Sequence, residues 1–167
     1  MSEFSLDEGS VGSGIIASVV AGIKYLLLPL ILLIGASSLL VQAGGQGMAR
    51  QIGLDDVINW VLILGIPIAA LAFFRGFYPR GSISRFTFGI IVVVLVCLWI
   101  WFVTRGGNLV LQFDQFGIAV SFTGLVLLFI LAAALKGLYY LAEMLSYRKE
   151  WLRSRQPSAS RMPSHRP

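Results

Sequence analysis

The side chains that could carry out chemistry are few in this sequence and lie far apart. Its single cysteine, Cys97, and its single histidine, His165, cannot supply a zinc site or a Ser-His-Asp triad within an apolar segment. Lys24 and Asn59 could line a polar path through a membrane, although a lysine at such a position can equally mark the membrane interface. The sequence contains no phosphate-binding loop and no zinc-protease motif. We therefore predict no catalytic, cofactor-binding or metal-binding residues, and we do not expect an enzyme.

The composition predicts an integral membrane protein. Hydrophobic residues make up 57% of the 167 residues and charged residues 13%, and the mean hydropathy is +0.83. Soluble domains contain ~25% charged residues, and a soluble domain of this size could not bury so much apolar surface. The opening residues, MSEFSLDEGS, are acidic, whereas a secretory signal begins with a basic region. We therefore expect the first apolar segment to remain in the mature protein.

Four uncharged runs are long enough to cross a bilayer as helices, because a hydrocarbon core of ~30 Å requires about 20 helical residues. None shows the strict alternation of a barrel strand. We predict an all-α fold with one transmembrane domain, residues 14–135, whose four spans cover residues 25–43, 57–74, 86–104 and 116–135. The first helix could begin earlier, since residues 14–23 are also apolar, and Lys24 would then lie inside the span.

The distribution of charge predicts the orientation of these spans. The connector between the second and third spans contains Arg75, Arg80 and Arg85, and residues 136–167 hold seven Lys and Arg against two acids. The basic residues of the other two connectors are Arg50 and Arg105, one in each. By the positive-inside rule, both termini are cytoplasmic, in a plasma or inner membrane. The connector arginines could contact lipid phosphates or a partner, and we expect anionic inner-leaflet lipids as partners, at ~1 kcal/mol per basic residue near the surface.

The segments outside the spans differ in character. Residues 1–13 predict a flexible acidic N-terminus, and residues 157–167, rich in Pro, Ser and Arg, predict a disordered basic tail. We do not expect the tail to bind nucleic acid, because it is short and has no folded module. In the second outer loop, NLVLQF is expected to form a short extended piece. Residues 136–156 predict an amphipathic cytoplasmic extension of the fourth helix, which lies on the inner leaflet or on a partner through Tyr140, Met144, Tyr147 and Trp151.

Small residues recur four positions apart and allow helices to approach each other closely. They are Gly14, Ser18 and Gly22 near the first span, Gly65 and Ala69 in the second, and Gly117 and Ser121 in the fourth. They could pack helices within the chain or join two copies of it. The first series is the best candidate for a contact between copies, because it lies outside the shortest first span.

These features favour a non-catalytic accessory or scaffold subunit of a larger membrane assembly, held by helix packing. Short loops and apolar helices without a catalytic constellation are typical of a chain whose role is to contact other subunits. The alternative is a homo-oligomeric small channel or transporter, since four spans with few polar residues cannot enclose a pore alone. The two hypotheses differ in stoichiometry, because only an accessory subunit associates with a different chain in a fixed ratio.

Overall fold

The computed structural model describes residues 9–42, 53–113 and 116–155, in which four helices are long and apolar enough to cross a membrane. The first is continuous over Val11–Gln42 and consists of α1 (Val11–Gly22), a π-helical turn (Ile23–Leu27) and α2 (Leu28–Gln42). The others are α4 (Leu54–Phe77), α5 (Ile83–Val103) and α6 (Thr123–Arg155). The prediction of four apolar helices of membrane-spanning length is therefore confirmed.

The first helix begins before the shortest predicted span. The Ser10 side chain caps it by accepting a hydrogen bond from the Ser13 backbone N–H. Residues 11–13, predicted to be flexible, are therefore helical, and Lys24 lies inside a helix of 32 residues. Residues 1–8 and 157–167, which were also predicted to be flexible, lie outside the described residues.

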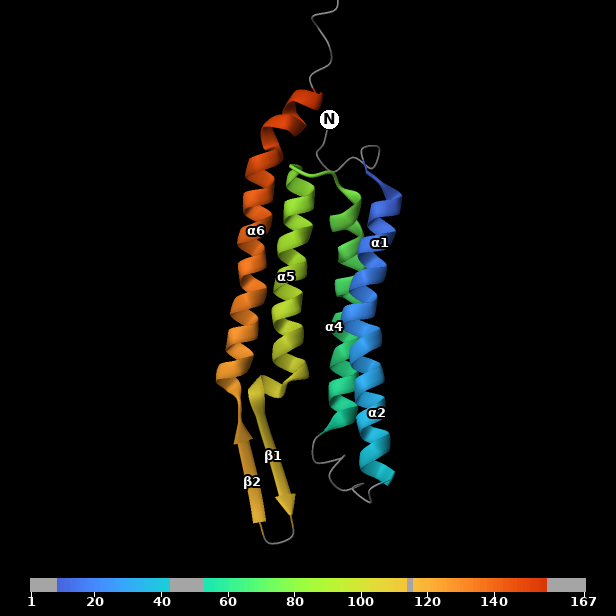
Figure 1. The fold of residues 1–167 in the computed structure, drawn as a ribbon, viewed down its shortest axis with the longest axis vertical. Coiled ribbons are helices and arrows are strands. Elements are labelled where there is room, and N and C mark those ends of the chain that lie inside the picture. Colours follow the sequence, from blue (N-terminus) through green and yellow to red (C-terminus); the bar gives the residue numbers. More distant parts are fainter. Residues whose placement is uncertain (1–8, 43–52, 114–115, 156–167) are drawn as a thin grey trace, which may run out of the picture.

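The helices form an open row in the order α1, α4, α5 and α6, each antiparallel to its neighbour (Figure 1). The start of α1, the connector 78–82 and the end of α6 lie together at one end of the helix axes, which we call the connector end (Figure 1). A hydrogen bond from Ser10 N to Phe77 O, of 3.0 Å, joins the start of α1 to the end of α4 there. We call the opposite end of the helix axes the hairpin end.

Close packing of α1 on α4 uses the small residues of both helices. The Ser18 hydroxyl donates a 2.9 Å hydrogen bond to the Ala69 carbonyl, and a Cβ atom at Gly14 would lie 2.9 Å from the Phe73 ring. A Cβ atom at Gly65 would lie 2.9 Å from the Tyr25 carbonyl oxygen. The structure therefore uses the series in the first and second spans, Gly22 and Ala69 included, to pack helices within one chain.

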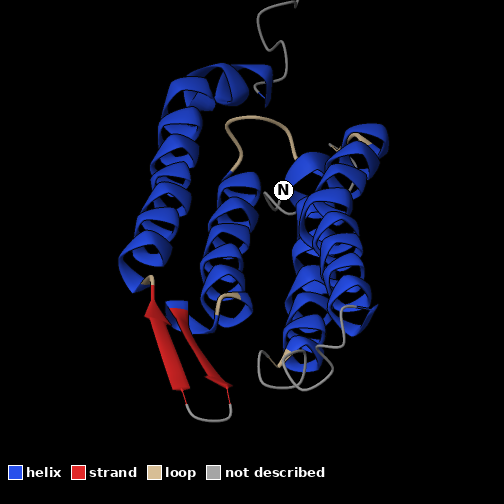
Figure 2. Cartoon of the chain, turned by 60° about the horizontal axis from the view of Figure 1, so that its bottom comes forward, coloured by secondary structure: helices blue, strands red, loops and turns tan. Residues whose placement is uncertain are grey.

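The predicted start of the fourth span is wrong. Residues Phe116–Ser121 form strand β2, which pairs antiparallel with β1 (Asn108–Phe113), so NLVLQF is extended as expected. The β1–β2 hairpin projects beyond α5 and α6 at the end opposite the connector end (Figures 1 and 2). Gly117 pairs with Gln112 and Ser121 with Asn108, so this small-residue pair belongs to a strand and not to a membrane-spanning helix. The sequence FGIAVS alternates larger apolar and small residues, a period of 2 that suits a strand.

Helix α6 begins at Thr123 and runs through Lys136 to Arg155 without interruption. A left-handed glycine, Gly107 with φ +80°, allows the close approach that starts it, because a Cβ atom there would lie 2.7 Å from the Thr123 Cα. The Phe122 N–H donates a 2.7 Å hydrogen bond to the Gly107 carbonyl, and the Thr123 hydroxyl donates to Gly106 O. The turn after α5 therefore fixes where both the hairpin and α6 begin.

Candidate functional site

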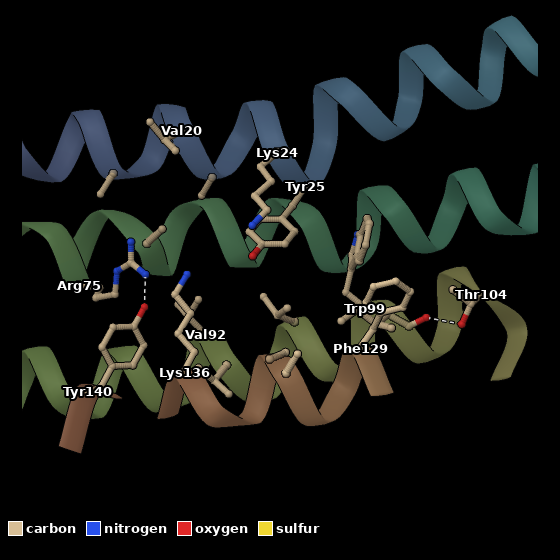
Figure 3. A pocket seen from close by; sticks show the side chains of 18 residues that line it. Val20, Lys24, Tyr25, Arg75, Val92, Trp99, Thr104, Phe129, Lys136 and Tyr140 are labelled. Atoms are coloured by element: carbon tan, nitrogen blue, oxygen red, sulfur yellow. Dashed lines mark hydrogen bonds between the residues drawn. The ribbon is translucent and has the colours of Figure 1, made fainter. Parts of the chain in front are cut away.

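A groove of about 660 Å³ extends along the helix axes, and all four helices contribute to its wall (Figure 3). The outermost helices of the row, α1 and α6, both line the groove and are not in extensive contact with each other (Figure 1). It extends from Tyr140 near the connector end to Thr104, the C-cap residue of α5. Its wall comprises Ala17, Val20, Ala21, Lys24, Tyr25, Ala72, Arg75, Val92, Val93, Val96, Trp99, Ile100, Thr104, Phe129, Ala132, Ala133, Lys136 and Tyr140.

Lys24, Arg75 and Lys136 reach into the groove from three different helical segments and point toward the same space (Figure 3). The residues that line the groove include no Asp and no Glu. Within the part of the chain that the structure describes, neither lysine forms an ion pair. The Lys24 ammonium lies 5.3 Å from the centre of the Tyr25 ring. The groove therefore concentrates positive charge within apolar helices.

The π-helical turn places Lys24 and Tyr25 on the groove. Pro29 has no N–H to donate to the Tyr25 carbonyl, and its ring would clash with that carbonyl in a regular helix. The helix widens here, and the Leu28 N–H donates to Ile23 O, five residues back. Gly65 of α4 leaves room for the widened turn. Such turns are frequent at functional sites, and this one follows from a single proline in the first apolar run.

Arg75 and Tyr140 close the groove toward the connector end. The Arg75 guanidinium donates a hydrogen bond to the Tyr140 hydroxyl and lies 5.6 Å from the centre of its ring (Figure 3). The Tyr140 side chain is buried, and Gly89 of α5 lies against its ring, where a Cβ atom would be 2.9 Å away. One side chain of α6 therefore ties α4 and α5 together at the mouth of the groove.

A second cavity, which we call the vestibule, lies beyond this mouth and has a volume of about 620 Å³. It shares Arg75, Lys136 and Tyr140 with the groove, and its wall also includes Arg80, Arg85 and Glu143. The nearly buried Glu143 accepts from Arg85 Nη2 at 3.1 Å, and Arg80 Nε lies 3.6 Å from the same oxygen. Cations therefore outnumber acids in the vestibule as well, but two of them are paired with a carboxylate.

The predicted contact residues of α6 lie against the chain's own connector. The Tyr147 carbonyl touches Gly81, where a Cβ atom would lie 2.7 Å away, and the Arg80 guanidinium lies 5.9 Å from the centre of the Tyr147 ring. Met144 lines a small cavity beside Gly81, and Trp151 is buried. The three connector arginines and the stripe of α6 thus meet within one chain.

The structure does not bring the two predicted polar-path residues together. Lys24 lines the groove, whereas Asn59 is exposed on α4 and is not among the lining residues. Sequence reasoning missed Lys136, which was assigned to the cytoplasmic extension. The available signal is that Lys136 interrupts the apolar run of the fourth helix as Lys24 interrupts that of the first. Trp99 was also missed, and its buried indole N–H has no hydrogen-bond partner among the described residues.

Comparisons of the chain with protein-family models, curated proteins and solved structures give no match. Within residues 9–42, 53–113 and 116–155, no group of three or more His, Cys, Asp or Glu is placed to hold a metal ion. The groove and the uncovered helix surfaces are therefore the features from which a function can be inferred.

Proposed function

We propose that the chain is a non-catalytic accessory or scaffold subunit of a larger membrane assembly, held by helix packing. The observation that carries this proposal is the surface of α2. Its 15 residues include no buried residue, whereas α1, α4 and α5 all bury residues against one another. Leu32 and Leu39 are among its most exposed side chains, at 63% and 68%. Half of the first helix is therefore left for something outside the chain to cover.

The composition of this surface favours a partner helix. Gly35, Ala36, Ser37 and Ser38 are consecutive small residues in the middle of α2, and small residues mark the sites where membrane helices pack. A Cβ atom at Gly35 would meet nothing within 4 Å. Both serine hydroxyls donate to the Ile34 carbonyl of their own helix, at 2.8 and 2.9 Å. They offer no free donor for a water-filled path, which supports an accessory role over a channel.

Charge supports a cytoplasmic position for the connector end, in a plasma or inner membrane. Arg75, Arg80 and Arg85 lie there with the basic end of α6, whereas Arg105 lies in the turn after α5 at the hairpin end, and in the sequence Arg50 falls between α2 and α4. The positive-inside rule then places both termini in the cytoplasm. The exposed Arg80, at 64%, is available to anionic inner-leaflet lipids. In this orientation the small residues of α2 lie in the outer half of the membrane.

A pair of glycine variants tests the proposal. Gly35→Leu fills the open surface of α2, and Gly124→Leu is the matched control, because a Cβ atom at either glycine meets nothing within 4 Å. The tagged chain is purified in mild detergent from the membranes in which it is made. We expect a different chain in a fixed ratio with the wild type and the control, and its loss with Gly35→Leu. If the chain associates only with copies of itself, the alternative of a homo-oligomeric channel or transporter is correct.

A further inference from the structure

The groove between α1 and α6 combines a cationic end with an apolar end. Arg75 and Lys136 lie toward the connector end, with Lys24 next to them near the middle of the groove, and Trp99 and Phe129 line the part toward the hairpin end (Figure 3). We propose that this groove binds a membrane lipid whose headgroup is a phosphate, with the phosphate between the three cations and a hydrocarbon chain along the apolar wall. This proposal is independent of the accessory role assigned to α2.

Charge is the first reason for this ligand. A cation within an apolar helix is expensive unless a counter-charge or water compensates it. Arg75 has a neutral partner in Tyr140, and neither Lys24 nor Lys136 has a carboxylate partner within the part of the chain that is described. Of the vestibule cations, Arg80 and Arg85 already share Glu143. Among the cations that line the two cavities, the three groove cations are therefore those without a carboxylate partner within the described residues.

Headgroup geometry is the second reason. The three cations approach one space from different helical segments, and a phosphate offers several oxygens to donors that arrive from different directions. The Arg75 guanidinium donates to Tyr140 through Nη1, which leaves its other N–H groups for a second acceptor. A phosphate monoester carries a charge of about −1.5 to −2 at neutral pH. It therefore matches three cations better than a phosphodiester or a carboxylate does.

The shape of the groove is the third reason, because it fits an amphiphile better than a free anion. Along α5 the lining extends from Val92 to Thr104, which corresponds to about 18 Å of helix. The outermost helices α1 and α6 both line the groove and are not in extensive contact with each other, so we expect a lipid to enter between them from the bilayer without passing through water. The unpaired indole N–H of Trp99 is a donor for an ester carbonyl below the phosphate.

The test measures lipid binding to the delipidated full chain by native mass spectrometry in a neutral detergent. The probes are dioleoyl phosphatidic acid, dioleoyl phosphatidylglycerol, dioleoyl phosphatidylcholine and dioleoylglycerol. We expect one equivalent of phosphatidic acid to bind, phosphatidylglycerol to bind more weakly, and the two probes without net charge to bind at least roughly tenfold more weakly than phosphatidic acid. Equal affinity for phosphatidic acid and phosphatidylcholine would overturn the proposal.

Charge variants connect the binding to the groove. Lys136→Gln and Lys24→Gln should each weaken phosphatidic acid binding roughly tenfold or more, because each removes a charge-assisted hydrogen bond. Lys149→Gln, on the exposed side of α6, should leave it unchanged. Lys136→Arg keeps the charge and should retain binding, which separates lost charge from misfolding. An equal effect of Lys149→Gln and Lys136→Gln would place the lipid on the surface and refute the groove.

The last two arms test the hydrocarbon chain. Ala133→Phe fills the apolar wall and should weaken phosphatidic acid binding, whereas Ala142→Phe, an exposed position on the same helix, should not. Inorganic phosphate at the concentration of the lipid should not compete, because it gains nothing from the apolar wall. Competition by inorganic phosphate, together with no effect of Ala133→Phe, would identify a free-anion site and overturn the assignment of a lipid.

Discussion

Gly76→Ala should separate α1 from α4 at the connector end. A Cβ atom at Gly76 would lie 2.5 Å from the Ala17 Cβ and 2.6 Å from the Ser13 carbonyl oxygen. Neither atom is the end of a flexible side chain, so the helices must move apart. Overpacking of this kind costs typically about 1–3 kcal/mol. Separation also strains the 2.7 Å hydrogen bond from the Ser13 hydroxyl to Gly76 O, which contributes about 0.5–1.5 kcal/mol.

The helix propensity of alanine offsets part of this cost, by about 1 kcal/mol, so we expect a net loss of about 0.5–3.5 kcal/mol in the free energy of unfolding. Gly35→Ala is the control, since nothing lies within 4 Å of a Cβ atom there. It should be neutral or stabilise by up to about 1 kcal/mol. The assay is circular dichroism in mixed micelles during titration with a denaturing detergent. Equal unfolding free energies for the two variants would refute the close packing of α1 on α4.

Three further predictions follow from the contacts of α6 and from the orientation. Glu143→Gln weakens the ion pairs that Arg80 and Arg85 form with α6 and should destabilise the chain by about 2 kcal/mol. The exposed control Glu150→Gln should change the free energy of unfolding by less than about 0.5 kcal/mol. The detergent titration described above measures both variants. Tyr140→Phe removes the acceptor of a guanidinium at the mouth of the groove and should cost about 1 kcal/mol in that titration; an unchanged transition would show that the bond contributes nothing. In a cysteine-free background, Asn108→Cys should react with an impermeant maleimide added to intact cells and Ser146→Cys only after permeabilisation, and the reverse pattern would invert the proposed orientation.

The four apolar helices were predictable because each contains an uncharged apolar run long enough to cross a bilayer. The start of α6 was not predictable from hydropathy, since FGIAVS and the first part of the helix, up to Leu135, form one uncharged apolar stretch. Only the period of 2 in FGIAVS distinguishes its strand from a helix. The pairing partner that decides the matter, NLVLQF, precedes it by two residues, and a hairpin requires both halves to be considered together.

The groove was predictable only in part. Lys24 stands out because it interrupts an apolar run, and Pro29 lies where a helix loses a hydrogen bond. Lys136 looks like the first residue of a cytoplasmic extension when the span is counted from Phe116, but α6 begins at Thr123 and packs beside α5, which places Lys136 within the row of helices. That the two lysines and Arg75 share one space depends on the order of the helices in the row. Sequence periodicity within single helices carries no information on that order.

Native mass spectrometry of the chain extracted at natural abundance in mild detergent tests the accessory role most directly. It preserves the contacts of α2 and reports the mass and stoichiometry of whatever covers its 15 residues. Our account predicts one different protein chain in a fixed ratio to this one, and dissociation of that chain when Gly35 is replaced by Leu. A closed homo-oligomer, or the chain alone with α2 covered only by lipid, would contradict it.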